Sequence, residues 1–295
     1  MKSVAFYYFT GTGNTLLVVK EMAAVFSEQA VPLELLPLER ADPRAVKLEG
    51  TIGLAFPVAA QSTYPFIWRF VEGMPRSAGA EVFMVDTLAG FSGGIVGPLK
   101  RLLKNKGYSP IGASEIIMPS NFFPKKRNAG KEERIKRAGL VRARQFALAL
   151  IEGRGRWERV PVLSDLVYWM SRSSLIWNYL RKLFPLAVDS SRCIRCGVCV
   201  KICPVKNIAL PEFPVFSDRC QVCMRCISFC PAEAISVPKK KYEAYRAVNV
   251  QEILNPRSEI PRRPTGRNQN KPRLPAGRQG LRGFRGLSIA GTKSV

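Results

Sequence analysis

The sequence predicts an α/β protein in which an open parallel sheet is followed by a second, small, cysteine-rich domain. Apolar strand-like runs alternate with segments of helical spacing through the first half of the chain, which is typical of such a sheet. All eight Cys of the 295 residues lie between positions 193 and 230. We therefore predict four parts: a sheet domain at 1–152, a helical linker at 153–187, a cysteine-rich domain at 188–254 and a basic, disordered tail at 255–295.

Each element of the sheet domain rests on hydrophobic periodicity. The runs that predict strands are 3–9, 51–56, 81–85 and 115–118. The segments that predict helices are 16–26, 63–73, 95–105 and 131–151. A further helix is expected over 162–184, with an apolar stripe that only Ser173 interrupts. We expect this stripe to pack between the two domains, and a peripheral membrane helix is the alternative, because Arg and Lys flank Trp169 and Trp177.

A polar loop between the first strand and the first helix predicts an anion site. Its residues are Thr10, Gly11, Thr12, Gly13, Asn14 and Thr15. Backbone N–H groups at a helix start attract anions, and the hydroxyl and amide side chains add donors. A dinucleotide loop would place Gly at position 16, where Leu16 stands, and a P-loop would need a Lys that this loop lacks. The pattern favours a terminal phosphate monoester, and a simple helix-capping turn is the alternative.

The cysteines form a duplicated motif, C-x2-C-x2-C-x3-C-P, that recurs at an offset of 27 residues. Three closely spaced thiolates can surround one face of an iron–sulfur cubane, while the fourth, before Pro, ligates the other cluster. One [4Fe–4S] cluster would take Cys193, Cys196, Cys199 and Cys230, and the other Cys220, Cys223, Cys226 and Cys203. Paired zinc sites or a disulfide knot are the alternatives, which this spacing disfavours.

These motifs resemble known families. The cysteine run resembles bacterial two-cluster ferredoxins over 188–238, and the Thr-Gly loop resembles the phosphate signature of flavodoxins. The segments 118–122 and 242–254 extend the resemblance to flavodoxin–ferredoxin fusion proteins over 1–254. That family implies a flavodoxin-like doubly wound parallel sheet, a small α+β ferredoxin domain, FMN and two [4Fe–4S] clusters.

The resemblance also implies which loops flank the flavin ring. They are the loop from Pro57 to Tyr64 and the loop from Asp86 to Gly94, in which Gly90, Phe91 and Gly93 allow close approach or stacking. The first loop has Ala59 and Ala60 where an aromatic residue is often found, and Tyr64 is the candidate substitute.

The absence of His excludes several classes of active site. A chain without His has no Ser-His-Asp nucleophile, no His-ligated haem and no His-based zinc enzyme. A flavin takes two electrons and releases them singly, and each cluster carries one, so we expect an electron carrier rather than a substrate-specific enzyme. A domain that binds no flavin and serves for docking is the alternative.

The net charge of +24 predicts an acidic redox partner or contact with an anionic membrane surface. The tail from 255 contributes ten Lys and Arg against one Glu, which leaves nucleic-acid binding as a lesser alternative, and no specific nucleic acid is expected. We expect no signal peptide and no transmembrane helix, and a cytoplasmic location.

Overall fold

The computed structural model describes residues 1–90, 93–122, 126–157 and 163–255, and these belong to one compact unit, Met1–Pro261. Its largest feature is a five-stranded sheet in which all neighbouring strands pair in parallel. The strands are β1 (Val4–Tyr8), β2 (Leu33–Pro37), β3 (Thr51–Pro57), β4 (Glu81–Leu88) and β5 (Ser109–Ile117). Their order, β2-β1-β3-β4-β5, is that of the flavodoxin-like doubly wound fold, so the predicted fold class is confirmed.

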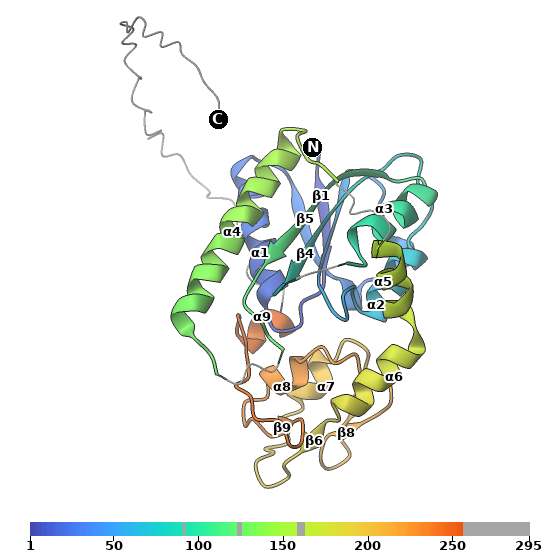
Figure 1. Cartoon of the computed structure of the whole chain (residues 1–295). Helices are drawn as coiled ribbons and strands as arrows, with labels where there is room; N and C mark the ends of the chain where they lie inside the picture. Colours follow the sequence, from blue (N-terminus) through green and yellow to red (C-terminus); the bar gives the residue numbers. More distant parts are fainter. Residues whose placement is uncertain (91–92, 123–125, 158–162, 256–295) are drawn as a thin grey trace, which may run out of the picture. The chain divides into compact units, whose positions relative to one another are not determined.

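Helices cover both faces of this sheet (Figure 1). The helices on one face are α1 (Asn14–Glu28) and α4 (Ala129–Ile151), and those on the other are α2 (Pro65–Gly73), α3 (Val96–Asn105) and α5 (Leu163–Arg172). Two short 3-10 helices, Leu38–Arg40 and Pro43–Ala45, follow β2.

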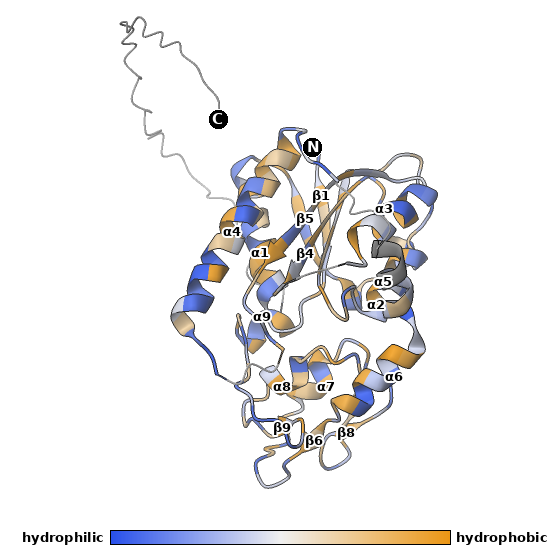
Figure 2. Ribbon diagram, viewed as in Figure 1, coloured by the Kyte–Doolittle hydropathy of each residue, from blue (hydrophilic) through white to orange (hydrophobic). Residues whose placement is uncertain are grey.

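Alternation of side chains along the strands divides the core into two layers. In β4, Phe83 and Val85 pack in the layer that includes α1 and α4, while Val82 and Met84 pack in the layer that includes α2 and α3. Figure 2 shows hydrophilic colours over much of α4, as expected for a helix with one face in water.

The structure differs from the prediction at β2, at β5 and in the segment 162–184. Strand β2 is not among the predicted strands, because Leu33-Glu34-Leu35-Leu36-Pro37 contains an acidic residue and a Pro that only an edge position tolerates. Strand β5 starts six residues before the predicted 115–118, since Pro110 and Gly112 obscure the apolar pattern. The start of the predicted 162–184 helix, residue 162, lies outside the described residues.

The predicted 162–184 helix is in fact two helices, α5 and α6 (Ser174–Leu183). Ser173 caps α6 by accepting a hydrogen bond from the N–H of Leu175, which explains the break. The stripe packs only in part: Trp177 is buried, whereas Trp169 and Met170 are exposed.

The cysteine-rich part consists of two similar strand–helix–strand units. Its elements are β6 (Ala187–Val188), α7 (Val198–Ile202), β7 (Ile208–Ala209), β8 (Val215–Phe216), α8 (Arg225–Ser228) and β9 (Ile235–Ser236). Strand β6 pairs antiparallel with β9, and β7 with β8. Ile208 and Ile235, which correspond at the 27-residue offset, are both buried in the small core of this part.

After β9 the chain returns to the sheet domain through residues 242–254, here called the return segment. It ends in α9 (Val250–Leu254), which begins with a capping box between Asn249 and Glu252. Lys20 of α1 forms an ion pair of 2.6 Å with Glu252. The return segment therefore anchors the cysteine-rich part to the first helix of the sheet domain.

Candidate metal centres and anion-binding loop

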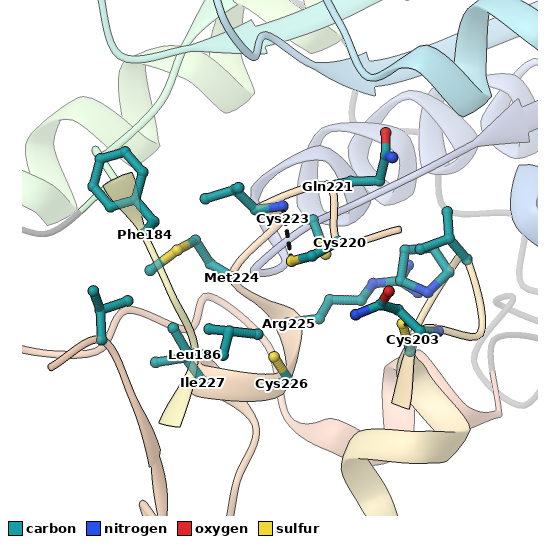
Figure 3. Close-up of a pocket in the computed structure, with 15 residues that line it drawn as sticks. Phe184, Leu186, Cys203, Cys220, Gln221, Cys223, Met224, Arg225, Cys226 and Ile227 are labelled. Atoms are coloured by element: carbon teal, nitrogen blue, oxygen red, sulfur yellow. Dashed lines mark hydrogen bonds between the residues drawn. The ribbon is translucent and has the colours of Figure 1, made fainter. Parts of the chain in front are cut away.

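Four cysteines surround one pocket in the cysteine-rich part (Figure 3). They are Cys203, Cys220, Cys223 and Cys226, here called the cluster-two set. Most of the other lining side chains are apolar, among them Phe184, Met224 and Ile227, and the polar ones are Asn207, Gln221 and Arg225. Four cysteines around one pocket match the donor set of an iron–sulfur cubane.

The other four cysteines line a second pocket. They are Cys193, Cys196, Cys199 and Cys230, here called the cluster-one set. In both pockets the cysteine before Pro comes from the other motif, as the spacing predicts. Across the described residues, no three His, Cys, Asp or Glu side chains are grouped so as to hold a single metal ion. A cubane needs thiols set wider apart than a single ion does.

The backbone repeats with the sequence. Residues with positive φ recur at the 27-residue offset: Arg195 with Val222, Gly197 with Met224, and Lys206 with Glu233. Left-handed conformations are costly for side chains other than Gly, and most so for a β-branched residue. The two motifs therefore share the same backbone conformation at these three positions.

Backbone N–H groups point at sulfur in both motifs. The N–H of Asn207 donates to Cys203 Sγ at 3.2 Å, and the N–H of Ala234 donates to Cys230 Sγ at 3.3 Å. Such bonds stabilise thiolate ligands and tune the potential of the iron they hold. Burial raises the pKa of the Cys223 thiol to about 12. A metal cation bound at Cys223 would favour the deprotonated thiolate.

The Thr-Gly loop connects the end of β1 to the start of α1. Its N-cap, Gly13, has φ 108°, and the helix has neither a side-chain cap nor an acidic residue in its first turn. Thr10 Oγ1 accepts from the N–H of Gly13 at 3.0 Å, and Thr12 Oγ1 accepts from Asn121 Nδ2 at 3.0 Å. Both hydroxyls accept in these bonds, so their hydrogens can still be donated to an anion.

The remaining polar side chains of the loop bond within the protein. Thr15 Oγ1 lies 2.8 Å from Thr87 Oγ1 at the end of β4. Asn14 donates from Nδ2 to the carbonyl of Pro119 at 2.8 Å, and its Oδ1 accepts from the Tyr245 hydroxyl at 2.5 Å. Asn14 therefore joins the loop to the segment after β5 and to the return segment.

The glycines of the loop allow the cluster-binding part to approach. A Cβ on Gly11 would lie 2.7 Å from the carbonyl oxygen of Cys223, and one on Gly13 would lie 2.7 Å from Val248 Cγ2. The N–H of Ala247 donates to the carbonyl of Thr12 at 2.8 Å. The predicted anion loop and the cluster-two set are thus in direct backbone contact.

Arg225 joins the two sites. It lies between Cys223 and Cys226 in sequence, and its side chain is 4% exposed. Nε donates to the Thr10 carbonyl at 2.8 Å, and NH1 lies 2.7 Å from Glu39 Oε1. The guanidinium also stacks over the Phe9 ring, 4.5 Å from its centroid.

The residues predicted beside a flavin ring are placed as follows. Pro57 ends β3, and its carbonyl accepts from Thr63 Oγ1 at 3.0 Å. Tyr64 is buried, with its ring packed against Phe9, Phe66 and Trp177. Tyr64 therefore contributes to the core here. The N–H of Gly93 donates to the Gln61 carbonyl at 3.1 Å, and a Cβ on Gly90 would meet no atom within 4 Å. Phe91 lies outside the described residues.

Several site residues are absent from the sequence-based prediction. Arg225 and Glu39 form the buried ion pair, and Tyr245 bonds the loop. The position of Arg225 inside the second cysteine motif is a feature of the sequence that could have indicated its role. Nothing local marks Glu39 or Tyr245, because they are brought to the site by chain segments far apart in sequence.

No helix within the described parts of the chain is long and apolar enough to cross a membrane. The family model "4Fe-4S binding domain" matches residues 186–209 and 213–236. No curated protein matches the chain.

Solved structures similar to the chain include two flavodoxins. That of Megasphaera elsdenii has 19% identity and a TM-score of 0.36, covering 47% of this chain and 98% of its own. Oxidised flavodoxin 1 from Bacillus cereus has 11% identity and a TM-score of 0.33, covering 48% and 98%. The rubredoxin oxygen:oxidoreductase of Desulfovibrio gigas has 15% identity and a TM-score of 0.31, covering 50% and 37%. The chain therefore combines a sheet of flavodoxin-like strand order with two motifs that match the 4Fe-4S binding domain model.

Proposed function

We propose that the chain relays electrons between FMN and two [4Fe–4S] clusters and exchanges them with an acidic redox protein. The observation that carries this proposal is the backbone contact between Gly11 of the anion loop and Cys223 of the cluster-two set. Electron transfer depends on short separation of cofactors, and this contact holds their two binding loops together. FMN supplies exchange between two-electron and one-electron carriers, and each cluster carries one electron.

The anion loop supports the flavin half of the proposal. The hydroxyls of Thr10 and Thr12 retain hydrogens to donate, and the first turn of α1 has no side-chain cap. These donors fit the oxygens of a phosphate monoester, and the positive end of α1 stabilises its charge. No carboxylate occurs within residues 10–15 to oppose an anion.

The cysteine sets support the metal half. Each set offers four thiols around an apolar pocket, and N–H groups donate to Cys203 and Cys230. Because one ligand of each set belongs to the other motif, loading one site also positions a residue of the other. Phe9 and Tyr64 belong to a hydrophobic cluster against which Cys223 packs.

Composition of the anaerobically purified protein tests this proposal. It should contain about eight Fe and eight sulfides per chain, and acid precipitation should release about one FMN. Protein with full iron and no flavin would contradict the FMN half alone. Protein with zinc in place of iron would contradict the cluster half.

The second candidate function is a flavin-free docking domain. It is favoured by the placement of Tyr64 in the core and of Asn14 between Pro119 and Tyr245. The same precipitation experiment separates the two candidates, because a docking domain releases no flavin. Adding FMN to such protein would also leave its thermal midpoint unchanged.

A further inference from the structure

A basic groove of about 740 Å³ lies beside the cluster-two set. Its cations come from α2, from α6 and from the loops around the cysteines: Arg69, Arg181, Lys206 and Arg219. Arg69, Lys206 and Arg219 are exposed, and Arg181 is half-buried. These four residues are called the groove cations below.

The groove cations lack carboxylate partners among the described residues. Arg219 donates to the Lys206 carbonyl, and Arg181 donates to Asn178 and to the Cys220 carbonyl, all uncharged acceptors. Of the two acidic residues in the lining, Glu39 is paired with Arg225, which leaves Asp218 alone against four positive charges.

Some basic side chains elsewhere have carboxylate partners. On α4, Lys136 and Arg137 both pair with Glu133, and Arg144 pairs with Glu28. The rim of the cluster-one set is similar, since Arg192 pairs with Glu233 and Arg195 with Glu212. The groove is therefore a place where positive charge is both concentrated and available.

Only a thin wall separates the groove from the cluster-two set. Pro204, Val205 and Gln221 line both the groove and the cysteine pocket. Pro204 follows Cys203, and Gln221 follows Cys220, so the wall consists of residues next to the ligands themselves. A molecule seated in the groove lies about one layer of side chains from the cluster position.

We propose that the basic groove is the docking surface for an acidic electron-carrier protein that exchanges electrons with cluster two. This rests on the proposed electron-transfer function and adds the place and the chemistry of the partner. Available cations attract a carboxylate-rich surface and speed its encounter. One electron passes from the reduced carrier to the oxidised cluster, so the carrier is oxidised by one electron as the cluster is reduced.

Stopped-flow reduction of the fully loaded protein tests this inference. The probe is a reduced, acidic two-[4Fe–4S] ferredoxin, mixed anaerobically at low ionic strength. Arg69→Glu with Lys206→Glu forms the groove variant, and Arg134→Glu with Arg142→Glu on the exposed side of α4 is the control with the same change in charge. Iron content is measured for every variant, to show that both clusters are still bound. The single variant Arg69→Glu is also tested, because Arg69 lies on α2, outside the cysteine loops.

The groove variant should react at least about tenfold more slowly than the control variant, and about 0.5 M salt should remove the difference. Reduction by a small, uncharged photoreductant should be unchanged in both variants. Equal rates for the groove and control variants would overturn the docking inference while leaving the electron-transfer function intact. Failure of the wild-type protein to accept electrons from the photoreductant would instead contradict the proposed function.

Discussion

The guanidinium of Arg225 lies 2.7 Å from the Glu39 carboxylate, and both side chains are almost fully buried. Glu39 belongs to the 3-10 helix after β2, and Arg225 begins the helix that carries Cys226. The pair joins the edge of the sheet to the cluster-two set. Burial of both charges is tolerated because Arg225 also donates to the carbonyls of Thr10 and Ile202.

Arg225→Met should lower the free energy of unfolding by about 3–5 kcal/mol, because it leaves the Glu39 carboxylate buried and unpaired. The double variant with Glu39→Met should recover part of this loss. Denaturant unfolding followed by far-UV circular dichroism measures both. Arg137→Met, which breaks the exposed pair with Glu133, is the control and should cost under about 1 kcal/mol. Equal effects for Arg225→Met and Arg137→Met would show that the buried pair has no structural role.

Cross-ligation makes an unusual prediction for single cysteines. Cys203→Ser should remove the cluster held by the second motif, although Cys203 belongs to the first, and Cys230→Ser should do the converse. The iron content should fall from about eight to about four atoms per chain in each variant. Electron paramagnetic resonance of the reduced protein should show that the surviving cluster differs between them. If Cys203→Ser instead removed the same cluster as Cys199→Ser, each cluster would be held by the four cysteines of a single motif.

Gly11→Ala should destabilise the contact between the anion loop and the cluster-two set. The new methyl would lie 2.7 Å from the Cys223 carbonyl oxygen, a backbone atom that no side-chain rotation can move. Overpacking of this kind costs about 1–3 kcal/mol, which lowers the thermal midpoint by several degrees. Gly90→Ala is the matched control, since a Cβ there meets no atom within 4 Å. Identical midpoints for the two variants would argue against the close approach.

Asp86 predicts a pH dependence of stability. It is fully buried in β4, and neither carboxylate oxygen has a hydrogen-bond partner among the described residues. Desolvation, with a smaller contribution from Glu115, raises its pKa well above the ordinary 3.8. A raised native pKa favours the protonated form, so this contribution to stability is complete below pH 3.8 and declines as pH rises towards the native pKa.

Asp86→Asn should therefore gain stability over the wild type as pH rises, by up to about 1.4 kcal/mol per pH unit. Unfolding between about pH 4 and pH 7 measures the difference. The exposed Asp218→Asn variant serves as control and should follow the wild type throughout. A constant difference between Asp86→Asn and wild type would mean that the carboxyl ionises equally in both states.

Local signals in the sequence predicted most of the sheet and located the two cysteine motifs. Strands β1 and β3 are largely apolar and β4 contains the apolar run 82–85, while the cysteine motif is recognised by its spacing. Strand β2 escaped prediction because edge strands need fewer apolar residues and tolerate Pro37. Ser173 was visible as the one gap in the 162–184 stripe, yet its role as the cap of α6 depends on a turn that periodicity does not encode.

The contacts between the two domains were beyond prediction, because they depend on tertiary approach. Ala247 bonds to Thr12 across more than two hundred residues, and Tyr245 reaches Asn14 over a similar separation. Tyr64 illustrates the opposite case, since an aromatic residue in a candidate flavin loop is placed in the core by Phe9 and Phe66. Sequence position alone cannot distinguish these two environments.

The central claim is that one chain carries a flavin and two clusters as connected redox groups. An anaerobic reductive titration of the purified protein, followed by visible absorption and electron paramagnetic resonance, tests it most directly. We expect uptake of about four electrons per chain, two at the flavin and one at each cluster. Uptake of about two electrons with iron–sulfur signals alone would contradict the flavin site, and uptake without any iron–sulfur signal would contradict the clusters.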